Sequence, residues 1–239
     1  LSTTGRLLRV DLGDEPGIPA PARRSKHDAI RSEIAGTTRG ELGAVTDRGR
    51  LIRFSPVDLP AAPVHSVQLA AGVKVGEYLT LEKNEKVIAI VDFLSEVPIA
   101  IGTAQGVVKR VAPGAWPNRP DFEVIGLKAG DRVIGANQAA ETDELVFVTT
   151  DAQLLHFAAG SVRPQGAAAG GMAGVKLGGS ASAIFFGAVD PSAAPVVVTV
   201  SASDGALPGA GPGRAKVSDF TEFPGKGRAT GGEIGRAHV

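Results

Sequence analysis

The stretch that decides the fold is Ala44-Val-Thr-Asp-Arg-Gly-Arg-Leu-Ile-Arg-Phe54, because its pattern is repeated along the chain. The stretch has a short apolar run, a polar turn that ends near a glycine, and a second run that carries basic residues. Related copies lie at 1–10, 100–111 and 146–157, and a fifth at 197–205 reaches its basic residues only after a Gly/Pro-rich insertion. Glycine accepts the positive φ that a tight hairpin requires. The sequence therefore predicts a series of β-hairpins.

The hairpins recur at the spacing of propeller blades. The equivalent turn positions are separated by 44, 57, 46 and 53 residues, taking Gly5, Gly49, Gly106, Ala152 and Gly205. A period of this size is typical of propeller-like repeats with four strands in each blade. Because Ala152 replaces glycine, a different turn is expected there.

Between the hairpins lie further strand pairs. They are expected at 78–81 with 87–91, at 123–127 with 132–136, and at 174–177 with 183–186. Two hairpins per period give an all-β, propeller-like domain of about five to six four-stranded blades. We expect one domain over residues 1–232 and a non-native or disordered tail at 233–239.

Composition excludes several classes of site. The chain has 239 residues and no cysteine, with 25 basic and 25 acidic residues, so disulfides and thiolate metal sites are absent. The histidines lack metal-ligand spacing, and no cofactor or metal is expected. The most apolar stretch, 181–200, is interrupted by Asp190, Pro191 and Pro195, so no membrane contact is expected and a cytoplasmic location is the default.

The hairpins and two longer strings resemble a known family. The strings are Val162-Arg-Pro-Gln-Gly-Ala-Ala-Ala-Gly-Gly-Met-Ala-Gly-Val-Lys-Leu177, after Leu154-Leu-His-Phe157, and Phe223-Pro-Gly-Lys-Gly-Arg-Ala-Thr-Gly-Gly232. With the Gly-x-hydrophobic-hydrophobic-Lys/Arg hairpins, they resemble the C-terminal domain of the DNA gyrase and topoisomerase IV A subunits. The resemblance covers residues 1–232.

The resemblance implies a β-pinwheel, in which neighbouring blades exchange strands, with duplex DNA bound at a basic outer rim. It implies a non-catalytic domain at the bacterial nucleoid, whose partners are the ATPase B subunit, the DNA and the catalytic core of the same A subunit. One feature departs from the family. The gyrase box Gln-Arg-Arg-Gly-Gly-Lys-Gly does not occur, and Gln165-Gly-Ala-Ala-Ala-Gly-Gly171 lacks its basic residues. Weaker wrapping than in a gyrase domain is therefore expected.

Basic residues beside successive turns are the candidate DNA contacts, because repeated cations on a disc rim can follow a line of phosphates. They are Arg6, Arg9, Arg48, Arg50, Arg53, Lys109, Arg110, Arg163, Lys176, Arg214, Lys216, Lys226 and Arg228. We expect a continuous positive rim with the acids on the flat faces. Lys83 and Lys86 share a turn with Glu82 and Glu85 and are expected to be neutralised locally.

Three other residues have expected roles without catalysis. His156 replaces a basic residue in the fourth hairpin, which predicts a weak DNA contact in that blade. Tyr78, in an expected strand, is interpreted as a packing residue, and Trp116 as a cover for apolar surface. The glycine-rich strings lack the Gly-Lys-Ser/Thr ending of a phosphate-binding loop.

Two alternatives stay open. A propeller-like scaffold that binds protein partners agrees with zero net charge. A propeller enzyme requires clustered acids or histidines at one end of the disc, which the sequence does not display.

Overall fold

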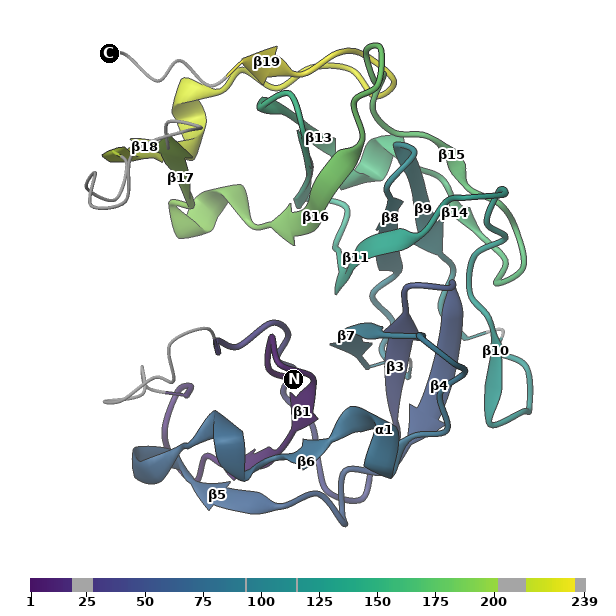
Figure 1. The fold of residues 1–239 in the computed structure, drawn as a ribbon, viewed down its shortest axis with the longest axis vertical. Helices are drawn as coiled ribbons and strands as arrows, with labels where there is room; N and C mark the ends of the chain where they lie inside the picture. The colour runs from purple at the N-terminus through teal and green to yellow at the C-terminus, as the bar shows by residue number, and fades with distance from the viewer. Residues whose placement is uncertain (19–27, 93, 115, 202–213, 235–239) are drawn as a thin grey trace.

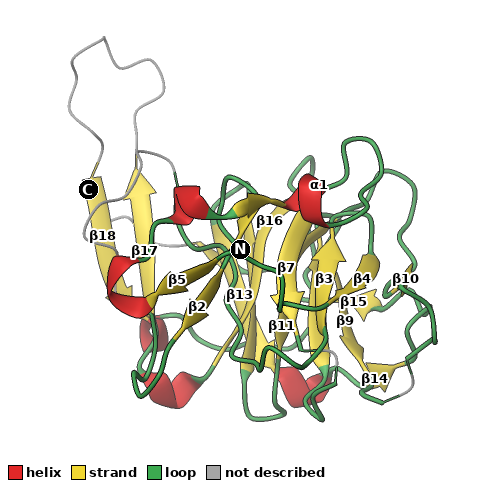
Figure 2. Ribbon diagram, turned by 90° about the horizontal axis from the view of Figure 1, so that it is seen from below, coloured by secondary structure: helices red, strands yellow, loops and turns green. Residues whose placement is uncertain are grey.

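The computed structural model describes residues 1–18, 28–92, 94–114, 116–201 and 214–234. Nearly all regular structure in these ranges is β-sheet, and α1 (Val75–Tyr78) is their one α-helix. The sheets follow one another along an open arc, and their strands run between the two flat faces of a disc (Figures 1 and 2). They group into five blades, which confirms the predicted propeller-like fold.

Blade two has the arrangement that the other blades repeat. β3 (Leu42–Thr46) and β4 (Arg50–Phe54) form the predicted hairpin, and β7 (Val87–Val91) pairs with β3 on the inner side. The outermost strand, β10 (Asp121–Glu123), pairs with β4 although it follows the hairpin of blade three in the chain. Each blade therefore lends an outer strand to the blade before it, as expected for a pinwheel.

Blades three and four have the same strand order, from the outer edge to the inside of the arc. Blade three contains β14 (Pro164–Gln165) and β15 (Met172–Ala173), then β9 (Val107–Val111), β8 (Ile99–Thr103) and β11 (Val133–Gln138). Blade four contains β19 (Glu233–Ile234), β13 (Gln153–Ala158), β12 (Glu144–Thr149) and β16 (Ala183–Val189). The strands expected at 87–91, 132–136 and 183–186 correspond to β7, β11 and β16. Their expected partners are corrected: the strand expected at 123–127 lies at Asp121–Glu123 in the blade before, and 174–177 contains no strand.

The two end blades differ from the others within the described residues: the four short strands of blade one form two separate two-stranded sheets, and blade five has two strands. Blade one contains β1 (Arg6–Leu7) and β2 (Arg9–Asp11), with β5 (Ala61–Pro63) and β6 (Val73–Lys74) lent by blade two. Blade five contains β17 (Val196–Ser201) and β18 (Arg214–Asp219). Short 3-10 helices lie at Val64–Ser66, Leu69–Ala71, Ala159–Ser161, Pro191–Ala193 and Phe220–Glu222.

The turn before the second hairpin strand has the same geometry in blades one to four. A buried hydroxyl accepts a hydrogen bond of 3.1–3.3 Å from the backbone N–H four residues further on, at Ser2, Thr46, Thr103 and Thr149. The fourth residue of each turn has φ between +59° and +79°, at Gly5, Gly49, Gly106 and Ala152. The different turn expected at Ala152 is therefore wrong. The alanine takes the same left-handed conformation, which costs it about 1–2 kcal/mol.

Glycine is required at two of these turns. A Cβ on Gly49 would lie 2.7 Å from the carbonyl oxygen of Ile125, and one on Gly106 would lie 2.7 Å from that of Val175. The chain segment that follows the outer strand therefore packs directly on the turn of the preceding blade. The fifth turn position, Gly205, lies outside the described residues.

Apolar clusters fill the space between neighbouring blades. One of them joins blades two and three and includes Val45, Leu51, Ile99 and Ile101, all at most 1% exposed. Trp116 packs against this cluster, with its ring centroid 5.9 Å from that of Phe122, as predicted. Two further clusters cover the opposite faces of blades two and three, so both faces of each of these blades are buried.

Tyr78 is a packing residue, as predicted, but the prediction of a strand around it is wrong. It ends α1, its ring meets that of Phe54 edge-on at 6.1 Å, and its hydroxyl donates to the carbonyl oxygen of Ser55 at 2.5 Å. The helix begins at Val75, whose side chain is buried. The amide of Val75 donates to the carbonyl oxygen of Gly5 at 3.0 Å, which joins the start of the helix to the turn of blade one.

The expected tail begins inside the fold. Glu233 and Ile234 pair with Leu154 and Gln153 as the outer strand of blade four, so the boundary expected at 232 is corrected. Residues 235–239 lie outside the described residues. Among the helices that are described, none combines the length and apolar character needed to cross a membrane.

Candidate nucleic-acid interface

Lys109 on β9 lies inside the disc. Its side chain is fully buried, and Nζ donates to the carbonyl oxygens of Val124 at 2.9 Å, Ala169 at 2.8 Å and Ala167. Three acceptors occupy all three N–H donors of an ammonium group. Burial lowers the pKa of Lys109 to about 8. The structure thus corrects the expectation that Lys109 faces DNA, because this cation ties two blades together.

Arg110 is buried on the opposite side of the same strand. Its guanidinium donates to the carbonyl oxygens of Ala159 and Val162, at 3.1 and 3.3 Å, in the connection that leaves the next hairpin. Burial lowers the pKa of Arg110. The expectation that it contacts DNA is corrected for the same reason.

The position of Arg110, four residues after the turn, links neighbouring blades elsewhere too. His156 has this position in blade four, and its Nε2 lies 2.7 Å from the carbonyl oxygen of Phe223. Its Nδ1 lies 3.0 Å from Glu144. In blade one, Arg9 donates to the carbonyl oxygen of Val57 at 2.9 Å. The weak DNA contact expected at blade four stays a prediction.

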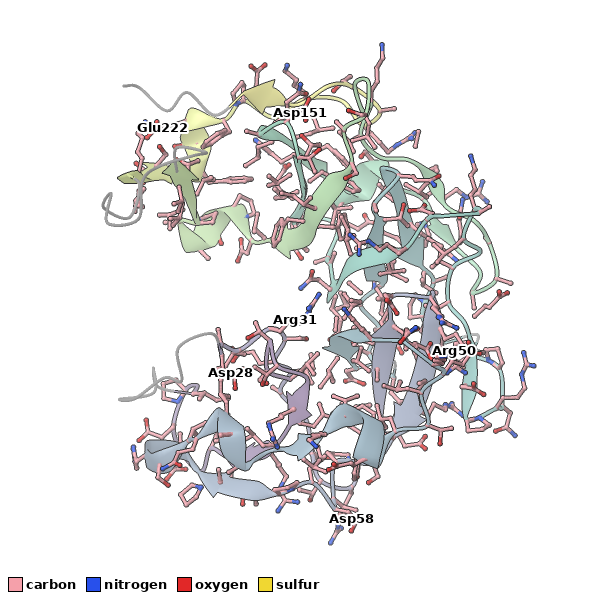
Figure 3. The ribbon with its side chains drawn as sticks, in the orientation of Figure 1. Asp28, Arg31, Arg50, Asp58, Asp151 and Glu222 are labelled. Atoms are coloured by element: carbon pink, nitrogen blue, oxygen red, sulfur yellow. The ribbon has the colours of Figure 1, made fainter. Side chains whose placement is uncertain are left out.

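Arg50 on β4 is the centre of an ion-pair cluster (Figure 3). Its Nε and Nη2 donate to both carboxylate oxygens of Glu85, at 2.9 and 2.8 Å, and its Nη1 contacts Asp121 on β10. The Glu85 side chain is fully buried. Burial opposes its ionisation, but hydrogen bonds from Arg50 and from the amide of Glu82 outweigh burial and lower the pKa of Glu85 to about 2. The charge of Arg50 is therefore neutralised within the blade.

The turn at 82–86 lies next to the hairpin of blade two. Its carboxylates form ion pairs with the arginines of that hairpin and not with Lys83 and Lys86 of the same turn. Glu82 contacts Arg48 and Glu85 binds Arg50, so the local neutralisation expected for Lys83 and Lys86 is wrong. The reason is that the two turns lie side by side: the amide of Asp47 donates to the carbonyl oxygen of Lys86 at 2.9 Å. The hairpin cations of blades two and three therefore do not supply a continuous positive rim.

A second set of cations lies on the convex side of the arc. We call the strands β10, β14 and β15 with their adjoining loops the outer edge. Arg119 precedes β10, Arg163 precedes β14, and Lys176 follows β15. All three side chains are exposed, and none has an ionic or hydrogen-bonding partner among the described residues. Figure 3 shows nitrogen-tipped side chains that project from this edge. These charges remain available to an anion.

The remaining predicted residues have partners of their own or lie half-buried. Arg6 donates to the carbonyl oxygen of Gly72 at 2.7 Å, and Arg228 to that of Ala173 at 2.6 Å. Lys216 and Lys226 pair with Glu222 and Glu233 on the surface, where such pairs contribute little. Arg53 is half-buried on β4, and the side chain of Arg214 lies outside the described residues.

Sequence reasoning missed Arg119. The signal was present, because Arg119-Pro120 and Arg163-Pro164 are the two Arg-Pro pairs of the chain, and each stands just before an outer strand. Lys128 and Arg132 are two further exposed cations, and they do not belong to the outer edge. They lie in the turn between β10 and β11, at the end of a blade.

A family model described as DNA gyrase C-terminal domain, beta-propeller, matches residues 44–91 and 143–186. Each matched segment runs from the first hairpin strand to the inner strand of one blade, in blades two and four. The match therefore follows the repeat that the structure displays.

The DNA gyrase A subunit of Salmonella typhimurium is 28% identical over 218 residues, which cover 89% of this chain and 23% of that protein. The chain thus spans about a quarter of the length of the curated relatives it matches. The C-terminal domain of DNA topoisomerase IV has a TM-score of 0.74 at 18% identity, covering 100% of this chain and 73% of that one. The DNA gyrase A C-terminal domain has a TM-score of 0.64 at 16% identity, with 98% and 74% covered. These structures share the fold, and the resemblance predicted from the sequence is confirmed.

Proposed function

We propose, from the premise that the chain is a relative of the DNA gyrase A C-terminal domain, that it binds and bends duplex DNA without catalysing a reaction. In this proposal it is one domain that guides DNA to a catalytic core elsewhere in the same protein. The partner of that core is an ATPase B subunit, and the location is the cytoplasm, at the nucleoid. The observation that carries the proposal is the outer edge, where Arg119, Arg163 and Lys176 are exposed without partners among the described residues.

Duplex DNA fits such an edge because its phosphates form a continuous line of negative charge. Each neutralised phosphate releases counterions and adds about 0.9 to the slope of log affinity against log salt. Phosphates carry no direct base information, so binding by these cations tolerates any sequence.

Bending follows from the arc, but the number of cations limits it. Curving a 20–30 bp site by 40–90° costs of order 1–6 kcal/mol, which several phosphate contacts must offset. The loop 166–171 on the outer edge contains no basic residue. We therefore propose weaker wrapping than in a domain that carries the gyrase box.

A charge-reversal pair tests the proposal. Arg119→Glu with Arg163→Glu alters the outer edge, and Lys128→Glu with Arg132→Glu makes the same charge change in the β10–β11 turn. Fluorescence anisotropy with a duplex of about 40 bp, titrated with salt, measures affinity and slope. We expect the outer-edge variant to lose roughly two units of slope and the matched control to lose little.

Topology gives a second readout. Relaxed circular DNA is ligated over the bound domain, and the trapped superhelical turns are counted. Few trapped turns support weak wrapping, whereas as many as a box-containing domain traps would contradict it. No measurable affinity at low salt would remove DNA binding altogether.

One observation favours the scaffold alternative. β17 and β18 expose Val196, Val198, Val200 and Val217, each more than half accessible. In blades two to four, the corresponding face packs against the next blade. The duplex titration separates the two functions, because a scaffold alone has no affinity for DNA.

A further inference from the structure

The loop 166–171 connects β14 to β15 on the outer edge, and Lys109 holds it from beneath. Two of the three acceptors of its ammonium group, the carbonyl oxygens of Ala167 and Ala169, belong to this loop. The third, on Val124, belongs to the segment that follows β10. The ammonium therefore fixes two loop carbonyls toward the interior. Burial lowers the pKa of Lys109 to about 8, so the group is still mostly protonated at neutral pH.

Peptide geometry determines where the next two amides point. In a trans peptide unit the carbonyl oxygen and the following N–H lie on opposite sides of the C–N bond. The described part of the chain has no cis peptide bond. Because the carbonyl oxygens of Ala167 and Ala169 point inward, the N–H groups of Ala168 and Gly170 point outward.

These two amides are available donors on the surface. Neither donates to an acceptor among the described residues, and both Ala168 and Gly170 are exposed. The loop is held in this shape by Gly171, which has φ +77° and whose Cβ would lie 2.7 Å from the carbonyl oxygen of Val108. Backbone N–H groups that face one side form a favourable place for an anion.

Two cations of the outer edge belong to the neighbouring segments. Arg163 lies just before β14, and Arg119 lines the same shallow hollow as Ala167 and Ala168. Asp121 also lines it, but its carboxylate contacts Arg50. Glu123 is the exposed carboxylate that opposes an anion here.

We propose that the amides of Ala168 and Gly170, oriented by Lys109, hold a phosphate of the DNA backbone on the outer edge between blades two and three. This inference rests on the proposed DNA binding and adds to it a contact made by the backbone. Lys109 is then a positioning residue, which acts through the loop and does not touch the phosphate. A loop without basic residues can thus still contribute to the DNA path.

Amide resonances test the contact directly. In the full chain, a duplex of about 20 bp should move the amide protons of Ala168 and Gly170 downfield, as new hydrogen bonds do. Inorganic phosphate is titrated at the same ionic strength as a second arm. Equal shifts with phosphate and no shift with duplex would overturn the assignment to DNA and indicate a small-anion site.

Two substitutions and a matched control complete the test. Ala168→Asp places a carboxylate beside the amides, and Ala129→Asp makes the same change in the exposed β10–β11 turn. We expect Ala168→Asp to weaken duplex affinity about tenfold, the effect of losing a hydrogen bond to a charged group. Ala129→Asp should change affinity less than about twofold. Glu123→Gln should tighten binding, because it removes the opposing charge.

Ala168→Pro removes the amide N–H itself at a residue without positive φ. The outcomes separate the two proposals. If the wild-type chain binds no duplex, DNA binding and this contact both fail. If it binds duplex while the Ala168 variants bind equally well and the two amides do not shift, the backbone contact is wrong and DNA binding stands.

Discussion

The second strands of the hairpins and the outer edge both carry arginine and lysine, in opposite surroundings. Arg50 and Lys109, on β4 and β9, are neutralised by a buried carboxylate or bound by carbonyl oxygens. Arg119 and Arg163 stand before outer strands, and their side chains are exposed without partners among the described residues. The same residue types therefore hold blades together in one region and remain available to a ligand in the other.

This comparison identifies which cations affect stability and which affect binding. A charge already surrounded by acceptors gains little from a phosphate and is costly to remove, because its buried partners lose their hydrogen bonds. An exposed charge contributes little to folding. Changes on the second strands should therefore lower the free energy of unfolding, and changes on the outer edge should lower DNA affinity.

The largest expected effect is that of Arg50→Met. The substitution leaves the buried Glu85 carboxylate without its main partner, and breaking a buried ion pair in this way costs about 3–5 kcal/mol. Urea unfolding of the variant and of wild type measures the difference. Arg119→Met is the matched control and should change the unfolding free energy by less than about 0.5 kcal/mol. Equal stability of the two variants would contradict the comparison.

Acid should weaken the same cluster. The pKa of Glu85 is about 2 in the folded chain, below its ordinary value of 4.5. The stabilisation is therefore complete above about pH 4.5 and is lost as the pH falls toward 2. Thermal unfolding across this range should decline more steeply for wild type than for Glu85→Gln, which has no carboxyl to titrate. Parallel declines would show that Glu85 does not contribute.

On the outer edge, Arg163→Ala should lower duplex affinity and leave stability unchanged. Loss of one phosphate contact reduces the log–log salt slope by about 0.9. Anisotropy titrations at several salt concentrations, with urea unfolding beside them, measure both quantities. A variant that unfolds more easily but binds DNA normally would place Arg163 with the hairpin cations.

The smallest expected effect is that of Ala152→Gly, and Gly49→Ala is the contrasting variant at an equivalent turn. Ala152 has φ +59°, so Ala152→Gly relieves backbone strain and should stabilise the chain by about 1 kcal/mol at most. Gly49→Ala should destabilise it, because its Cβ would lie 2.7 Å from the carbonyl oxygen of Ile125. Thermal unfolding of both variants tests the pair, and a stabilised Gly49→Ala would show that the turn relaxes.

The repeated turn made the hairpins predictable, since a serine or threonine stands four residues before the second strand in blades one to four, and a glycine directly precedes three of these strands. The exchange of strands between blades could not be read from the residues alone. Outer strands such as β14 and β15 contain two residues each, too few to show periodicity. That feature came from the family resemblance.

The misplacement of Lys109 and Arg110 has a physical reason. Adjacent residues on a strand point to opposite faces, so these two could not both lie on one rim. Both faces of blade three are covered by neighbouring blades, and both cations are therefore buried. The sequence interpretation assumed that basic residues mark a solvated face. Arg163 was placed correctly on the surface because it stands in a loop.

Hydrogen–deuterium exchange of the full chain, with and without a duplex of about 40 bp, tests the central claim most directly. The claim is that DNA follows the outer edge, while the second-strand cations serve the fold. DNA should slow exchange at β10, β14, β15 and the loop 166–171, and leave the turns at 82–86 and 128–131 unchanged. Protection of those turns, with unaltered exchange along the outer edge, would contradict the account.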